Sequence, residues 1–212
     1  MAHIKFNKEI ILDNSIEIAI DQGFSAISVR NVAKKVGCST APIYTAFENV
    51  DALITETKDR VLELLLEFIA KEYTKNKFLN VGVGTLVFAS KFPRLYKELY
   101  IDSFDSIHES KLRERTLELL MLSEIAKIMD KAQLEVVLTK MWLMTHGIAA
   151  KLCSGAITVA NEEDLIKMLG EVGGEIITAM VVKSGKFKGD IDSLVEEGSG
   201  NEIANFGWDI WN

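Results

Sequence analysis

The chain has 212 residues, of which 48% are hydrophobic, so it is long enough to form one or two domains with a sizeable core. Its net charge of −7 counts against a protein that coats nucleic acid nonspecifically, and only two prolines favour a mostly helical fold. The absence of any uninterrupted apolar run of about 18 residues argues against a membrane span, and two lone cysteines and an N-terminus without a secretory signal lead us to expect a cytoplasmic protein.

The first predicted helix covers about residues 7–22. Its apolar stripe is formed by Leu12, Ile16 and Ala19, which recur at helical spacing. We expect this helix to be a scaffold for two short helices that follow it.

Residues 23–54 have the pattern of a helix-turn-helix. Ser28 stands where its hydroxyl can cap a short helix, and Gly37 stands where a left-handed residue can end it. The apolar face between them, at i, i+3, i+4 and i+7, consists of Val29, Val32, Ala33 and Val36. Ser39 is then expected to cap a second short helix over residues 40–47. Two helices joined by a short turn that contains Gly form the layout that places a recognition helix in the major groove of DNA.

Charge is distributed unevenly along the chain. Residues 1–50 hold five cations and five anions, so the whole net charge of −7 lies in residues 51–212. Residues 25–47 contain three cations and no anion. We expect the acidic body to repel DNA while this locally basic segment contacts it.

Five positions in the helix-turn-helix segment follow a known arrangement. A Gly-Phe pair precedes the first short helix, a Gly lies in the turn, and Tyr-x-x-Phe ends the second helix. These residues are Gly23, Phe24, Gly37, Tyr44 and Phe47. The segment, over about residues 8–56, thereby resembles the N-terminal domain of TetR-type repressors. The resemblance implies an all-α protein, with an N-terminal three-helix helix-turn-helix domain that binds DNA and a larger helical domain for ligand binding and dimerisation.

The second short helix is expected to read DNA. Ile43 and Phe47 lie four residues apart and should anchor it inward, so the side chains that face the groove are Thr40, Ala41, Tyr44 and Thr45. By resemblance, Tyr44 is a phosphate donor. Further contacts to the DNA backbone are expected from Ser28, Arg30, Lys34 and Ser39.

Two residues depart from the family pattern. The family often has His just before the final Phe and Lys three residues after it, whereas this chain has Ala46 and Val50. Two customary phosphate contacts are therefore missing, and we expect a modest salt dependence of DNA binding. The alternative for Lys34 and Lys35 is an ordinary solvated helix face.

The body begins with a long predicted helix over about residues 50–75, which in the resembling family carries the regulatory movement. Residues 78–90 alternate apolar residues with two glycines, and we expect a loop that runs into a short helix. Pro93 suits the first turn of the next helix. Another amphipathic helix is predicted over residues 109–129.

Two long adjacent helices are predicted over residues 131–154 and 161–183. Their apolar seams alternate three and four residues apart, as in half of a four-helix bundle. The seams are Leu134, Leu138, Met141, Thr145, Ile148 and Leu152, then Leu165, Leu169, Val172, Ile176 and Ala179. We expect the chain to form a homodimer through these two helices.

Trp142, His146 and Gly147 form a Trp-x-x-x-His-Gly motif, which resembles the C-terminal domain of a TetR-type subgroup named for these residue types. Trp142 and His146 share a helix face and are expected to line a small-molecule pocket. The other expected pocket residues are Phe88, Phe92, Tyr96, Tyr100, Phe104 and Met121. Alternatively, Trp142 and His146 are core residues, with His146 bonded to a carbonyl or a tyrosine. His146 and Cys153 have no third ligand or base at a convincing spacing, so we expect no metal, no cofactor and no catalytic residue.

The sequence divides into three parts. These are the DNA-binding domain (1–49), the ligand-binding and dimerisation domain (50–185), and an acidic, Trp-containing tail (186–212). The tail is either flexible or docks its aromatic end in an apolar groove.

Together these features predict a sequence-specific transcriptional regulator. It would be a homodimeric repressor that binds a palindromic operator in double-stranded DNA and is released by an unknown, small apolar or aromatic effector. One alternative is a ligand-independent DNA-binding dimer. A further alternative is an all-helical enzyme, but the three scattered histidines (His3, His108 and His146) supply no nucleophile–base pair.

Overall fold

The computed structural model describes residues 7–102 and 106–184, which form nine α-helices, two 3-10 helices and no strand. In chain order they are α1 (Lys8–Gln22), η1 (Phe24–Ala26), α2 (Val29–Val36), α3 (Ala41–Ala46), α4 (Val50–Ala70), α5 (Lys77–Lys91), α6 (Pro93–Tyr100), α7 (Ser106–Met121), η2 (Glu124–Lys127), α8 (Lys131–Cys153) and α9 (Glu162–Ser184). The expectations for Phe104 and for the tail lie outside the described residues.

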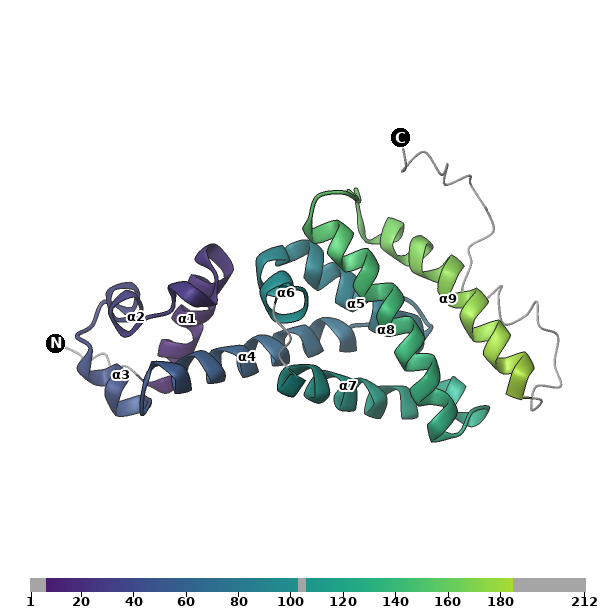
Figure 1. Ribbon diagram of the computed structural model, residues 1–212, viewed down its shortest axis with the longest axis horizontal. Coiled ribbons are helices and arrows are strands. Elements are labelled where there is room, and N and C mark those ends of the chain that lie inside the picture. Colours follow the sequence, from purple (N-terminus) through teal and green to yellow (C-terminus); the bar gives the residue numbers. More distant parts are fainter. Residues whose placement is uncertain (1–6, 103–105, 185–212) are drawn as a thin grey trace.

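The molecule is elongated, with a head and a body. Figure 1 shows α1, α2 and α3 as the head at one end and α5 to α9 as the body at the other, with α4 running between them. This arrangement confirms the expected all-α fold with a helix-turn-helix head and a larger helical body. No helix in the described ranges is long and apolar enough to cross a membrane.

The helix α1 is the scaffold of the head. Asn7 caps its start, because the side-chain oxygen accepts a hydrogen bond from the Ile10 N–H at 2.9 Å. The residues that it buries are Ile11, Ser15, Ile18 and Ala19. The buried stripe is therefore shifted from the predicted one: Leu12 and Ile16 are only half-buried, because packing against α2 and α4 selects the neighbouring face.

The helix α4 is shared by head and body. Asn49 caps it by accepting the Ala52 N–H at 2.8 Å, and its 21 residues span about 32 Å. Its first half packs along α1, and its second half packs against α5 and α7 (Figure 1). It ends about five residues before the predicted end, since the chain turns there and the Thr74 N–H bonds to the Asn80 side chain at 2.8 Å.

The prediction of a loop within residues 78–90 is wrong, because the segment belongs to the continuous helix α5. Asn76 caps α5 by accepting the N–H groups of its first turn. Neighbouring helices α4, α8 and α9 surround α5, and a helix buried on nearly all sides shows no amphipathic period in its sequence. Gly84 permits the close approach of α4, since a Cβ there would overlap the Phe68 backbone.

The prediction of a single helix over residues 109–129 is also wrong. The helix α7 stops at Met121, and the shorter η2 follows. The Ser123 hydroxyl donates to the Leu120 carbonyl at 2.6 Å, a local bond that competes with continuation of the α-helix.

The helices α8 and α9 pack against each other, as predicted, and a capping box between Asp130 and Gln133 fixes the start of α8. Most of the predicted α8 seam is buried, and its C-terminal end is half-buried. The α9 seam differs beyond Leu169: Val172 is 43% exposed and Ala179 is exposed, so these side chains lie on an open face of the chain.

Candidate functional site

The helix-turn-helix is held together by local bonds and a small apolar core. The Ser28 hydroxyl accepts the Asn31 N–H at 3.2 Å and so caps α2, as predicted. Gly37 ends α2 in a left-handed conformation with φ 77°, which a glycine adopts without strain. The buried anchors between the two helices are Val32, Ala33, Ile43 and Phe47.

The recognition helix α3 begins one residue later than predicted, and Ser39 does not cap it. Thr40 is the residue at the cap position, and its side chain makes no capping hydrogen bond. Pro42 lies in the first turn, where its missing N–H has no helical partner to lose. The hydroxyls of Ser39 and Thr40 therefore lie at the exposed start of α3 rather than in its capping.

Most of the side chains predicted to contact DNA are exposed on α2, the turn and α3. The exposed ones are Arg30, Lys34, Ser39, Thr40, Ala41, Tyr44 and Thr45, and Ser28 is half-buried. Tyr44 stands out, since 61% of it is exposed although it is a large aromatic residue. The Thr45 hydroxyl donates to the Ala41 carbonyl at 3.0 Å and still has lone pairs that can accept a bond.

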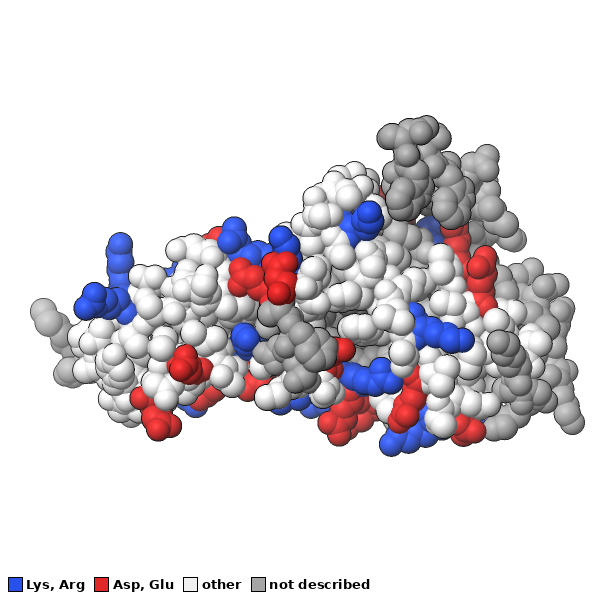
Figure 2. Space-filling view, in the orientation of Figure 1, with Lys and Arg blue, Asp and Glu red and all other residues white. Residues whose placement is uncertain are grey.

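The two adjacent lysines of α2 have different surroundings. Lys35 pairs with Glu17 of α1 at 2.7 Å, whereas neither Lys34 nor Arg30 forms an ion pair with a described residue. On the face shown in Figure 2, basic side chains project at the α2 end of the head. The charges of Arg30 and Lys34 are therefore available to an external anion.

A polar contact joins the head to the body, and it could not be predicted from the sequence. Glu98 of α6 accepts the backbone N–H of Phe24 at 2.8 Å, just after α1 ends. Gly23 has φ 92°, and a Cβ there would overlap the Glu98 carboxylate. The Gly23-Phe24 pair that marks the family pattern is thus also the place where α6 contacts the head.

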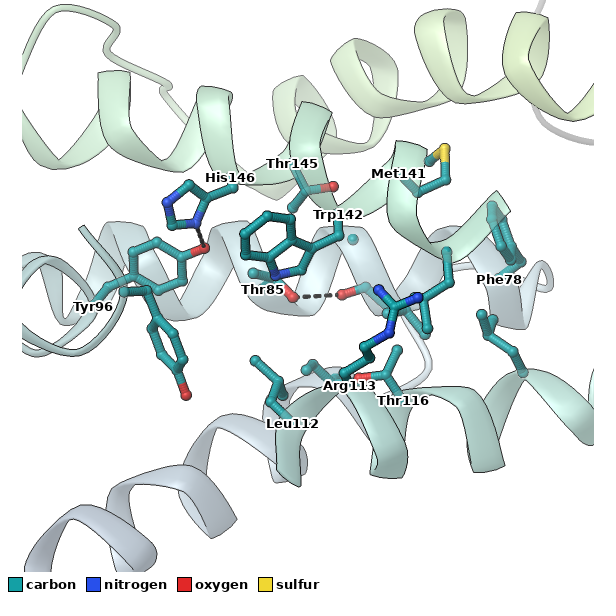
Figure 3. Close-up of a pocket in the computed structure, with 16 residues that line it drawn as sticks. Phe78, Thr85, Tyr96, Leu112, Arg113, Thr116, Met141, Trp142, Thr145 and His146 are labelled. Atoms are coloured by element: carbon teal, nitrogen blue, oxygen red, sulfur yellow. Dashed lines mark hydrogen bonds between the residues drawn. The ribbon is translucent and has the colours of Figure 1, made fainter. Parts of the chain in front are cut away.

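A pocket lies in the body between α4, α5, α6, α7 and α8 (Figure 3). Its cavity volume is about 50 Å³. The walls are formed by Ile69, Phe78, Val81, Gly82, Thr85, Tyr96, Tyr100, Leu112, Arg113, Thr116, Leu120, Leu138, Met141, Trp142, Thr145 and His146. The pocket is therefore narrow and mostly apolar, as small-molecule sites in proteins are.

The structure brings together four of the eight residues predicted for this pocket, namely Tyr96, Tyr100, Trp142 and His146. Phe88 and Phe92 are instead part of an aromatic cluster with Phe68, with ring centroids 5.3–6.1 Å apart. Met121 is 46% exposed and does not line the pocket. The walls from α5 and α7 could not be predicted from the sequence, because which face of each helix meets the pocket depends on how the helices pack.

A hydrogen-bonded aromatic group closes one end of the pocket. The Tyr96 hydroxyl lies 3.2 Å from His146 Nδ1, and the Trp142 ring stacks on the imidazole with centroids 5.0 Å apart. Burial lowers the pKa of His146 from 6.5, against an opposing effect of Glu109, and burial raises the pKa of Tyr96. Both side chains are therefore neutral at pH 7.

The described part of the chain holds no group of three potential metal ligands. Burial raises the pKa of Cys153, whose Sγ lies 3.8 Å from the Ala89 carbonyl oxygen, so the thiol is a poor nucleophile at neutral pH.

Comparison with known proteins agrees with this geometry. Residues 11–57 match the family model of bacterial regulatory proteins of the tetR family, and no curated protein matches the chain. Two similar solved structures are a TetR-like transcriptional regulator from Rhodococcus sp. RHA1 and a putative transcriptional regulator, a TetR family protein, from Vibrio parahaemolyticus. The first has a TM-score of 0.51 and 17% identity over 89% of this chain and 99% of that chain. The second has a TM-score of 0.53 and 13% identity over 84% and 95%.

The two kinds of comparison support different statements. The family match concerns the head, whereas the structural likeness, at identities of 17% and 13%, concerns the fold of nearly the whole chain. The chain therefore has the N-terminal domain and the fold of tetR-family transcriptional regulators.

Proposed function

We propose that the chain is a sequence-specific, DNA-binding transcriptional regulator that acts as a homodimeric repressor and responds to a small apolar or aromatic effector. The observation that carries this proposal is the surface of α2 and α3. It is exposed and basic, presents Tyr44, and lies within the segment that matches the tetR family.

The contacts to DNA follow from this surface. Insertion of α3 into a major groove directs Thr40, Ala41 and Thr45 to base edges. Arg30, Lys34, Ser28, Ser39 and the Tyr44 hydroxyl then meet phosphates on either side of the groove. Ala46 and Val50 supply no such contact, so specific binding depends strongly on the phosphate contacts that remain.

Dimerisation through α8 and α9 is supported by large apolar side chains on their open faces. These are Val136 and Leu143 on α8 and Val172 and Val182 on α9, with exposed fractions between 43% and 60%. Burial of such side chains against a second copy is favourable, and the open face of two packed helices completes a four-helix bundle. Two heads would then meet successive major grooves about 34–36 Å apart on a palindromic operator.

Coupling between effector and DNA is supported by the position of α6. This helix contributes Tyr96 and Tyr100 to the pocket and Glu98 to the head. An effector that moves α6 therefore alters the support of the helix-turn-helix. The resulting change in DNA affinity is limited by the difference in effector affinity between the free and DNA-bound shapes. Trp142 and His146 of the Trp-x-x-x-His-Gly motif line this pocket, which supports a resemblance to the Trp-His-Gly subgroup.

The second candidate is a DNA-binding dimer without an effector. It is favoured by the narrowness of the pocket, whose 50 Å³ of open space holds only a few water molecules. The two candidates differ in whether any small molecule changes DNA affinity.

Selection from random DNA fragments at about 150 mM salt, followed by sequencing, tests the proposal. We expect enrichment of one palindrome with half-sites about one helical turn apart, bound by a dimer. A retained pool with no shared sequence, from protein of confirmed dimer mass, contradicts specific DNA binding. Small molecules are then screened for release of the enriched fragment, and release separates the first candidate from the second.

A further inference from the structure

Arg113 places a positive charge at one end of the pocket. It contributes the only Lys, Arg, Asp or Glu side chain among the 16 lining residues. Figure 3 shows its guanidinium extending from α7 toward α8, beside Trp142. The residue is exposed, so the charge lies at the mouth of the pocket rather than in its interior.

The partners of Arg113 are neutral. One terminal nitrogen, Nη2, donates to the Thr139 hydroxyl at 2.8 Å and lies 3.4 Å from the Glu135 backbone carbonyl. No described carboxylate forms an ion pair with the guanidinium. A guanidinium has five N–H donors in a planar fork, so this one keeps donors for a further acceptor, and a carboxylate matches the fork.

The end of the pocket near His146 is less favourable for an anion than the end near Arg113. Glu109 lies close enough to His146 to raise the pKa of the imidazole, although burial outweighs it. An anionic group at that end would meet a neutral imidazole, which offers it no positive charge. An anion at the Arg113 end would meet a cation, so we expect an acidic molecule to place its charged group there.

The shape of the pocket limits the size of the molecule that can bind in it. Between the two ends the wall is apolar or carries hydroxyls, and the Thr85 hydroxyl is bonded to the Val81 carbonyl at 2.9 Å. The narrow cavity therefore suits a linear chain or a single flat ring better than a bulky fused ring system.

We propose that the effector is a slim apolar monocarboxylate, with its acid group on Arg113 at the mouth and its apolar part between α5, α7 and α8. This inference rests on the proposed function in taking the pocket as an effector site. It adds the chemical class of the effector and the residue that selects it.

Calorimetric titration of the 212-residue protein with octanoate and 4-phenylbutyrate tests the inference, with the amides of the same two acids as neutral probes. We expect at least one acid to bind, and its amide to bind about tenfold more weakly, because a charge-assisted bond is lost. R113Q should weaken the acid about tenfold and leave the amide unchanged. R113K should restore part of the affinity, since it keeps the charge without the fork.

Arg115 provides the matched control. It lies on the same helix, is exposed, and pairs with Glu118 at 3.4 Å without lining the pocket. R115Q removes the same charge from the same helix and should leave acid binding unchanged. Equal affinity for acid and amide, equal loss in R113Q and R115Q, or no binding of any of the four probes overturns the inference.

Measurements of DNA binding and release with the same probes separate this inference from the proposed function. If the amides release the selected operator and the acids do not, the regulator stands and the carboxylate preference fails. If the acids bind through Arg113 while no DNA sequence is enriched, the pocket chemistry stands and the proposed function fails.

Discussion

At the scale of single residues, two adjacent lysines of α2 differ in their surroundings. Lys34 and Lys35 are adjacent, but only Lys35 is neutralised by a neighbour, Glu17. In sequence the two are equivalent, and the distinction arises from the way α1 crosses α2. We therefore expect Lys34 to contact phosphate, whereas Lys35 mainly joins two helices of the head.

Lys34→Ala should weaken operator binding and lower the log–log salt slope by about two units, one for each protomer of the dimer. Tyr44→Phe should weaken binding by about 1 kcal/mol per half-site without changing the slope, because the lost donor is uncharged. Fluorescence anisotropy over a salt series measures both quantities. Lys35→Ala is the control, and a slope change equal to that of Lys34→Ala would contradict the assignment.

His146 makes the stability of the body depend on pH. Burial lowers its pKa in the folded chain from 6.5, so as the pH falls the unfolded chain binds the proton first. The contribution of neutral His146 is therefore complete above pH 6.5 and is lost as the pH falls below that value toward the folded-state pKa.

Urea unfolding at about pH 7.5 and 5.5 measures this effect. The midpoint for the wild-type chain should fall more between the two conditions than the midpoint for His146→Gln, which cannot take up the proton. An identical fall in both proteins would show that other groups set the pH dependence.

At the scale of elements, α5 shows why periodicity misled the sequence analysis. Alternating apolar residues and two glycines suggested irregular structure, yet α5 is a helix enclosed by its neighbours. Gly82 and Gly84 are present because other helices lie against them: a Cβ on Gly82 would lie 3.2 Å from Leu169, and one on Gly84 would overlap the backbone of α4.

Gly84→Ala should destabilise the fold by about 2–3 kcal/mol, because two helix backbones cannot move aside as a side chain can. Gly174→Ala is the matched change, since a Cβ there meets nothing within 4 Å. It should be neutral or stabilise the helix by up to about 1 kcal/mol. Equilibrium urea unfolding compares the two, and equal effects would argue against the close approach of α4 and α5.

Elements marked by local sequence features could be predicted from the sequence. Elements whose form depends on packing between helices could not. The head could be placed because its caps, its turn glycine and its apolar face lie within about 30 residues. The pocket could be placed only in part: Trp142 and His146 form a motif, but Arg113 and Thr116 gain their role from the rotation of α7. Phe88 and Phe92 are aromatic, as pocket residues often are, but they pack against each other instead of lining the pocket.

At the scale of the whole molecule, the open faces of α8 and α9 determine what assembly is expected. Leu143 is 60% exposed on α8, and the proposed dimer would bury it. Leu122, which is 75% exposed just beyond the end of α7, lies outside those faces.

Leu143→Glu should convert the dimer to a monomer, because burial of an unpaired carboxylate in an apolar interface is strongly unfavourable. Operator affinity should fall by at least about tenfold, since one head must bind alone. Sedimentation equilibrium measures the mass, and Leu122→Glu is the control that should remain dimeric. A dimeric Leu143→Glu protein would move the interface to another face.

The continuity of the core has a consequence for how such a chain can evolve. One cluster of buried apolar residues runs from Ile11 in α1 through α4 to Leu169 in α9. Recombination that exchanged the head at residue 50 would remove Leu53 and Thr57 from the core they share with α1, and would leave Glu98 facing a foreign turn. If α3 reads an operator, as proposed, we expect a change of specificity to come more readily from point substitutions on the outer surface of α3 than from a transplanted head.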